Sequence, residues 1–133
     1  MIKKVLFDTD VLIEDLRQKD KETTFKILKS QKAKLYISSI SLTELWAGES
    51  ITKPKGKRQV AQLLKEVTTI PLTNQILTRA GGELRNDRNL YLADALVAAT
   101  ALIKKLPLVS LNRRHFEKIK GLNLYDIQLP HTN

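Results

Sequence analysis

Residues 5–13 read Val-Leu-Phe-Asp-Thr-Asp-Val-Leu-Ile, and the rest of the chain is best understood outward from this stretch. An apolar run that favours β structure, predicted as a strand over 3–7, ends abruptly at Asp8, and a helical pattern follows at once. Apolar residues on both faces at the end of the strand are typical of a strand buried in a parallel sheet. Asp8 therefore stands at the carboxyl end of that strand, where open α/β sheets bind their ligands.

The composition describes a folded and strongly basic protein. The chain has 133 residues, of which 42% are hydrophobic, so we expect a single domain over residues 1–133 with its own core. Lysine and arginine number 23 against 14 acidic residues, which gives a net charge of +9. Such an excess favours nucleic acid, an acidic membrane or an acidic protein as the partner, although it also serves solubility alone.

Several features bear on the cell compartment. Cysteine is absent, which excludes disulfides and zinc–thiolate sites and fits a reducing compartment. Asp8 and Asp10 interrupt the N-terminal apolar run, so no signal peptide is visible. The longest apolar stretch, 95–103, is too short to span a bilayer. Together these features predict a cytoplasmic protein that is not associated with a membrane.

Short apolar runs alternate with helical patterns along the chain. The further strands that we predict are 35–38, 67–72, 106–111 and, at an edge of the sheet, 122–127. The predicted helices are 10–16, 22–30, 41–48, 59–66, 73–84 and 91–102. Residues 51–58 are predicted to form a loop because they contain Pro54 and Gly56, and 112–120 a short helix or turn. This alternation predicts an α/β protein, a three-layer α/β/α sandwich with a central, mainly parallel sheet of four or five strands.

Polar residues stand at equivalent points of successive strand–helix units. Asp8 ends the first strand, and Glu44 lies in the first turn of the helix after the second. Asp94 lies near the start of the apolar helix, and Asn112 follows the fourth strand. Because parallel strands point the same way, we expect these four residues to converge at one edge of the sheet.

Each of these residues also has a purely structural interpretation. Asp8 and Asn112 have the chemistry of helix caps, and Asp94 suits the positive end of a helix dipole. The segment Ser41-Leu-Thr-Glu44 has the form of a capping box, with Glu44 as its distal half. The first helix is expected to be capped by Thr9 or Asp10.

If the carboxylates do converge, their chemistry points to a cation. Carboxylates held close together repel one another, and burial raises their pKa. A divalent cation removes both costs, and oxygen donors without cysteine or histidine make Mg²⁺ or Mn²⁺ the natural choice. On a basic protein such a cation suggests phosphodiester chemistry, in which the metal activates a water and basic residues hold the nucleic-acid backbone.

Four segments together carry a resemblance to a known family. They are residues 5–13, 38–45 (Ser-Ser-Ile-Ser-Leu-Thr-Glu-Leu), 92–101 (Leu-Ala-Asp-Ala-Leu-Val-Ala-Ala-Thr-Ala) and 110–116 (Ser-Leu-Asn-Arg-Arg-His-Phe). In this order and spacing, over nearly the whole chain, they resemble the PIN-domain ribonucleases and are most similar to VapC-type toxins of bacterial toxin–antitoxin pairs. The third segment, an aspartate followed by an alanine-rich helix, is the most specific of the four.

The resemblance implies a metal-dependent endoribonuclease toxin. The metal ligands that it implies, directly or through water, are Asp8, Glu44 and Asp94. Thr9 and Ser110 would support the site through hydrogen bonds. Asn112 stands where many relatives carry aspartate and others asparagine, which favours one well-filled metal site over two. Family members usually form homodimers and are silenced by a cognate antitoxin, whose tail enters the active groove.

Other side chains have more than one interpretation. The RNA-binding candidates are Lys53, Lys55, Lys57, Arg58, Arg113 and Arg114, although a solvated surface also explains the first four. Asp10 is expected to cap the first helix, with outer-sphere support of the metal as the alternative. Trp46 is expected in the core or at a dimer interface rather than stacked on a base. Asp87 fits a solvated turn. His115 and His131 could form an acid–base ribonuclease without metal, but both are expected at the surface.

Two other classes of protein compete with the toxin. A PIN-like module could bind or process nucleic acid without being a toxin. A phosphotransferase of the haloacid dehalogenase type is suggested by Asp8-Thr9-Asp10 after a strand. That signature requires Gly-Thr next, whereas Val11 and Leu12 follow here, and it needs a late lysine and an acidic pair that are not found in the pattern.

Overall fold

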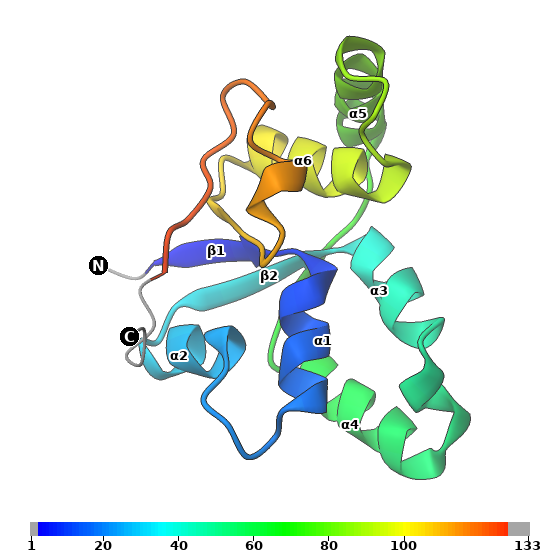
Figure 1. Ribbon diagram of the computed structural model, residues 1–133, viewed down its shortest axis with the longest axis vertical. Coiled ribbons are helices and arrows are strands. Elements are labelled where there is room, and N and C mark those ends of the chain that lie inside the picture. The colour runs from blue at the N-terminus through cyan, green and yellow to red at the C-terminus, as the bar shows by residue number, and fades with distance from the viewer. Residues whose placement is uncertain (1–2, 128–133) are drawn as a thin grey trace.

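The computed structural model describes residues 3–127, and within them it contains a parallel four-stranded sheet in the order β3-β2-β1-β4 (Figure 1). The strands are β1 (Lys4–Phe7), β2 (Lys34–Ser38), β3 (Thr68–Ile70) and β4 (Leu108–Val109). The α-helices are α1 (Thr9–Arg17), α2 (Thr24–Ser30), α3 (Ser39–Trp46), α4 (Pro54–Leu64), α5 (Asn74–Asn86) and α6 (Leu92–Lys104). Two short 3₁₀ helices are η1 (Glu49–Thr52) and η2 (Arg113–His115). The predicted three-layer α/β/α architecture is confirmed.

Strand β1 lies inside the sheet and separates two apolar cores. Val5 and Phe7 pack with α1, α2, α3 and α4, whereas Leu6 packs with α5 and α6, because successive side chains of a strand point to opposite faces. Phe7 contacts Phe25 of α2 with ring centroids 5.4 Å apart. Figure 1 shows α5 and α6 on one side of the sheet and α1, α2 and α4 on the other. The site at the end of β1 is thus held from both layers.

Helix α6 is central, as its nearly continuous apolar sequence predicts. Every side chain from Ala95 to Ala101 is buried. The small alanines let the helix pack closely against its neighbours α5, α3 and β2. This packing fixes the first turn of α6, where Asp94 lies. Within residues 3–127 no helix is both long enough and apolar enough to cross a membrane.

The loop predicted over 51–58 is wrong. Residues 49–52 form η1, and α4 already begins at Pro54, the first helical position, where the fixed φ of proline suits a helix and its missing N–H costs nothing. Gly56 is buried within the first turn of α4 rather than breaking the helix. The basic residues of this segment therefore lie mostly on a helix.

The predicted fifth strand is reduced to a single bridge. Leu124 pairs in parallel with Leu108 of β4, and no named strand is formed between residues 122 and 127. The pairing is confined to bonds from Leu108 N to Asn123 O at 2.8 Å and from Tyr125 N to Leu108 O at 2.8 Å. The sheet thus has four strands, at the lower end of the predicted range.

Helices α1 and α3 start one and two residues earlier than predicted, because each follows its strand without a loop. Asp8, not Thr9 or Asp10, is the N-cap of α1, and its carboxylate accepts from Thr9 N. Ser38 caps α3, so the capping box expected over 41–44 is also wrong. Thr73 is the N-cap of α5, and its side chain accepts from Ile76 N.

Candidate active site

Asp8 is held between β1 and β4. Its backbone N–H donates to Val109 O at 2.9 Å, which continues the β1–β4 pairing by one residue. Its side chain is buried, and the carboxylate accepts from Thr9 N and from Ser110 Oγ, each at 2.9 Å. The predicted supporting residue Ser110 therefore does contact Asp8, from the end of the neighbouring strand.

Asp10 connects α1 to the segment after β4. Its carboxylate accepts from Leu111 N at 3.2 Å and from Asn112 Nδ2 at 3.1 Å. It also lies 3.4 Å from Ser110 Oγ. The expectation that Asp10 caps α1 is wrong, and its actual role is to hold Asn112 beside the first turn of that helix.

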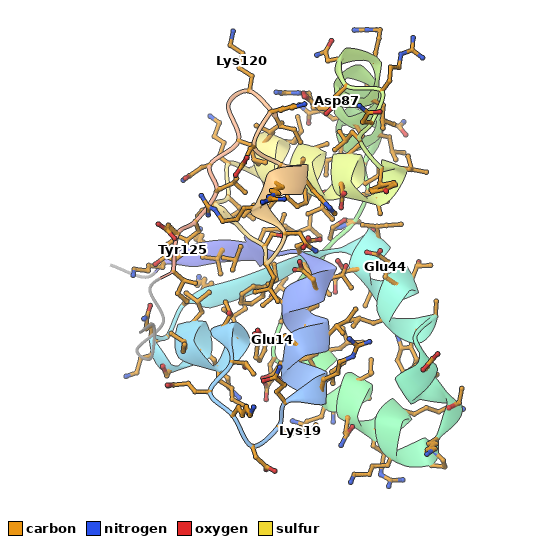
Figure 2. All side chains as sticks on the ribbon, in the orientation of Figure 1. Glu14, Lys19, Glu44, Asp87, Lys120 and Tyr125 are labelled. Carbon is orange, nitrogen blue, oxygen red and sulfur yellow. The ribbon has the colours of Figure 1, made fainter. Side chains whose placement is uncertain are left out.

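Thr9 connects α1 to α3. Its hydroxyl donates to Glu44 Oε1 at 2.6 Å and lies 2.8 Å from the buried Ser41 Oγ. Figure 2 shows Glu44 on α3, at the end of the sheet where α1 begins. Ser41 and Glu44, which the sequence suggested as a capping box, thus both face Thr9 across the helix interface.

Asp94 contacts a residue that the sequence interpretation placed apart from the site. His115 Nδ1 lies 3.1 Å from Asp94 Oδ2, with side-chain exposures of 43% and 15%. The edge of Tyr91 meets the imidazole, with ring centroids 6.0 Å apart and an angle of 65° between the planes. Sequence spacing alone carried no signal for this pair, because only the turn through η2 brings His115 to α6.

All four residues expected to converge border one hollow of about 290 Å³. It is lined by Asp8, Thr9, Asp10, Ile13, Glu44, Tyr91, Ala93, Asp94, Asn112 and His115. Asp8 and Asn112 follow the strands β1 and β4, whereas Glu44 lies in the second half of α3 and Asp94 in the first turn of α6. We call this the acidic hollow.

Negative charge in the acidic hollow is costly, because its carboxylates are buried and close to one another. Burial, and next the charge of Asp10, raise the pKa of Asp8 to about 7. Burial also raises the pKa values of Asp10 and Asp94. For Asp94 the nearby His115 opposes this shift, while Glu44 and Asp10 add to it. A bound cation would therefore stabilise the site in its ionised form.

The donor set fits a hard divalent cation by type, since it offers carboxylate oxygens and an amide within one hollow. Within residues 3–127, however, no three His, Cys, Asp or Glu side chains are arranged so that they could hold a metal ion as they stand. Each of the three expected ligands already has a side-chain partner in the protein: Asp8 with Ser110, Glu44 with Thr9 and Asp94 with His115. Metal binding would require small side-chain rotations that bring these carboxylates closer together while they keep their protein partners.

None of the expected RNA-binding residues lines the acidic hollow itself, and two of them border other hollows that share a residue with it. Arg114 borders an adjoining hollow of about 160 Å³ together with Asp94 and His115. Arg113 donates to Tyr125 O at 3.3 Å and so points along the C-terminal segment. Lys53 borders a hollow of about 450 Å³, whose lining includes Glu44 as well.

The remaining predicted side chains have simpler surroundings. Lys55, Lys57 and Arg58 are exposed on α4. Trp46 is 42% exposed, so the core is wrong for it, whereas the dimer interface stays a prediction. Asp87 accepts from Asn89 N within a turn. His131 lies outside the described residues.

Comparison with known proteins agrees with this architecture. A family model described as PIN domain matches residues 5–122. The chain is 34% identical over 122 residues to Ribonuclease VapC10 of Mycobacterium tuberculosis, covering 89% of this chain and 90% of the relative. Over most of its length, the fold thus coincides with a recognised sequence family.

Solved structures give the same result. A toxin–antitoxin complex from Klebsiella pneumoniae matches with a TM-score of 0.72 and 28% identity, covering 92% of this chain and 99% of that one. DNA-bound VapBC from Salmonella typhimurium matches with a TM-score of 0.77 and 25% identity, covering 95% and 98%. The chain therefore belongs to the PIN domain family. Within that family it is of the VapC type, and the haloacid dehalogenase alternative is not supported.

Proposed function

We propose that this protein is a metal-dependent endoribonuclease, the toxin of a type II toxin–antitoxin pair, which hydrolyses RNA phosphodiester bonds. The observation that carries this proposal is the acidic hollow, in which carboxylates from distant segments come together at one edge of the sheet. Relatives named ribonucleases and neighbours named toxin–antitoxin complexes support the same conclusion.

Asp8, Glu44 and Asp94 would hold one Mg²⁺ or Mn²⁺, directly or through water. When bound, the cation would supply an activated water and neutralise charge on the phosphate. Ser110 orients the Asp8 carboxylate, and Thr9 orients that of Glu44. Asn112, held by Asp10, offers a neutral amide beside these acids.

The RNA backbone would be held at the borders of the acidic hollow. Arg114 and Lys53 are the best placed cations, because each borders a hollow that also contains one of the proposed ligands. Arg113 and the exposed cations of α4, Lys55, Lys57 and Arg58, would extend the positive surface. Phosphate contacts of this kind give affinity that falls as salt rises.

The partner of the resting protein would be a cognate antitoxin. The hollow of about 450 Å³ between α1 and α3 is bordered by Arg17 and Lys53 as well as by Glu44. Its border also contains Glu49, so the hollow as a whole is not cationic, but Arg17 and Lys53 offer partners for an acidic tail that reaches Glu44 and blocks RNA. We propose in addition a homodimer that acts in the cytoplasm.

The decisive experiment compares RNA cleavage by the wild type with that by Asp8→Asn and Asp94→Asn in the presence of Mg²⁺. Both variants keep the size and most hydrogen bonds of the acid but lose its charge, so cleavage should fall below detection while the protein stays folded. Asp20→Asn, at an exposed position outside the hollow, is the matched control and should cleave normally. Wild-type rates in both site variants would overturn the proposal.

The toxin role needs a test of its own, because a PIN-like RNA-processing enzyme would also cleave RNA. Expression of the wild type should arrest growth, and Asp8→Asn should relieve the arrest. Co-expression with the product of the neighbouring reading frame should also relieve it. Cleavage in vitro without any growth arrest would instead favour an RNA-processing module that is not a toxin.

A further inference from the structure

His115 has no part in the proposal above, yet it contacts one of the proposed ligands. We propose that His115 is a positioning residue, which holds one oxygen of the Asp94 carboxylate so that the other is available to the divalent cation. The inference rests on the proposed function and assigns a further residue to the same site.

The contact itself suits this role. His115 Nδ1 lies 3.1 Å from Asp94 Oδ2, and both side chains line the acidic hollow. A carboxylate has two oxygens, so an N–H donor on one of them leaves the second free. Carboxylates that bind metals are commonly held by such outer donors, and loss of the donor typically costs 10–100-fold in metal affinity or activity.

The imidazole is itself held in place from two sides. Tyr91, just before α6, meets the ring with its edge. Next to His115 along the chain, Phe116 is buried, and its N–H donates to Arg113 O at 3.0 Å. His115 N donates to Asn112 O at 3.1 Å. The turn is thus fixed by a core side chain and by backbone bonds, and a fixed donor can orient Asp94.

The other two proposed ligands show the same arrangement. Asp8 accepts from Ser110, and Glu44 accepts from Thr9. With His115 on Asp94, each proposed ligand has one side-chain donor from a different element of the fold. This regularity favours positioning over a chance surface contact.

The test measures Mn²⁺ affinity by calorimetry on the full-length protein, without RNA, for the wild type, His115→Ala and His115→Asn. Alanine removes the donor, whereas the side-chain N–H of asparagine takes a position close to that of Nδ1. We expect His115→Ala to weaken Mn²⁺ binding by roughly 10–100-fold and His115→Asn to stay near the wild type. Lys120→Ala, exposed on the same C-terminal segment, is the control and should bind normally (Figure 2).

The outcomes separate this inference from the proposed function. Equal or tighter binding by His115→Ala would overturn the positioning role while leaving the metal site intact, and tighter binding would mean that the histidine competes with the cation. Weak binding by both variants would also overturn it, since the donor would then not be the cause. Absence of Mn²⁺ binding in the wild type would defeat the proposed function first. If His115→Ala fails to fold, His115→Leu, which also lacks the donor, takes its place. Its Mn²⁺ affinity is then compared with that of His115→Asn and of the wild type.

Discussion

The acidic hollow has two sides that are built differently. On the strand side, Asp8 and Ser110 directly follow β1 and β4, and the pairing of Phe7 with Val109 places them side by side. On the helix side, Glu44 and Asp94 stand on α3 and α6, and side-chain donors hold their carboxylates. The strand side is therefore placed by the backbone ladder, whereas the helix side depends on how two helices pack.

The difference shows how one fold can hold several acids close together. Backbone pairing places the most buried acid, Asp8, which has the most strongly raised pKa of the group. The acids on the helices are more exposed, and each is held through one oxygen by a side-chain donor, Glu44 by Thr9 and Asp94 by His115. We infer that the strand side sets where the cation sits and the helix side adapts to it.

The largest expected effect is a pH-dependent loss of stability caused by Asp8 in the metal-free protein. Its pKa is about 7 when folded, against 3.8 as the ordinary value, so the folded state binds more protons between these limits. The free energy of unfolding should therefore fall as pH rises from about 4 to about 7 and stay low above. The full contribution would be about 4 kcal/mol. Urea melts across this range measure it.

Asp8→Asn is the comparison for this effect. The amide cannot ionise, so the variant should match the wild type at pH 4 and be more stable than it at pH 8. Added Mn²⁺ should raise the melting temperature of the wild type at pH 8 but not that of the variant. If the stability of the wild type does not fall relative to that of Asp8→Asn between pH 4 and pH 8, the raised pKa of the buried Asp8 is contradicted.

The helix side should respond to packing instead. Ala98 is fully buried in α6, so Ala98→Leu would force the helix away from its neighbours and lower the free energy of unfolding by up to about 3 kcal/mol. Because Asp94 is one turn earlier on the same helix, RNA cleavage should fall as well. Ala61→Leu on the exposed side of α4 is the matched control and should change stability by less than about 0.5 kcal/mol. Chemical denaturation with an activity assay tests both.

Thr9 joins the two sides, so its loss should uncouple them. In Thr9→Val the hydroxyl that Ser41 and Glu44 share disappears, and the buried Ser41 Oγ loses its partner. We expect about 2 kcal/mol of lost stability and weaker Mn²⁺ binding, with the pH dependence due to Asp8 retained. Thr9→Ser keeps the hydroxyl and should recover most of both losses. If valine leaves both measurements unchanged, the two sides do not communicate through Thr9.

The sequence predicted the parts of this structure that depend on a simple periodic pattern. Residues 5–7 of β1 and 95–101 of α6 are buried, and an unbroken apolar run indicates this directly. The N-caps were misassigned because Asp8 and Ser38 end a strand and begin a helix at the same residue, which spacing cannot show. Pro54 looked like a helix breaker, although the first helical position suits it.

The site was predictable only in part, for a related reason. Strand order and direction bring Asp8, Glu44, Asp94 and Asn112 to one edge, and the alternating pattern is enough to expect it. The partners of these residues are set by side-chain geometry across helix interfaces. Thr9 with Glu44 and His115 with Asp94 are such pairs, and neither follows a sequence period.

The smallest expected effect concerns the C-terminal end of α6. It tests whether the position of Asp94, in the first turn of the helix, is independent of how the helix ends. Lys105 ends the helix with φ of 55°, in the left-handed region that glycine adopts without strain. Lys105→Gly should therefore raise the free energy of unfolding by about 1 kcal/mol, whereas Lys104→Gly, inside the helix, should lower it by a similar amount. Thermal melts and RNA cleavage would be measured for both.

Because Asp94 is held at the other end of α6 by His115, Lys105→Gly should leave cleavage unchanged. Altered cleavage would mean that the whole of α6, and not its first turn with His115, positions the carboxylate.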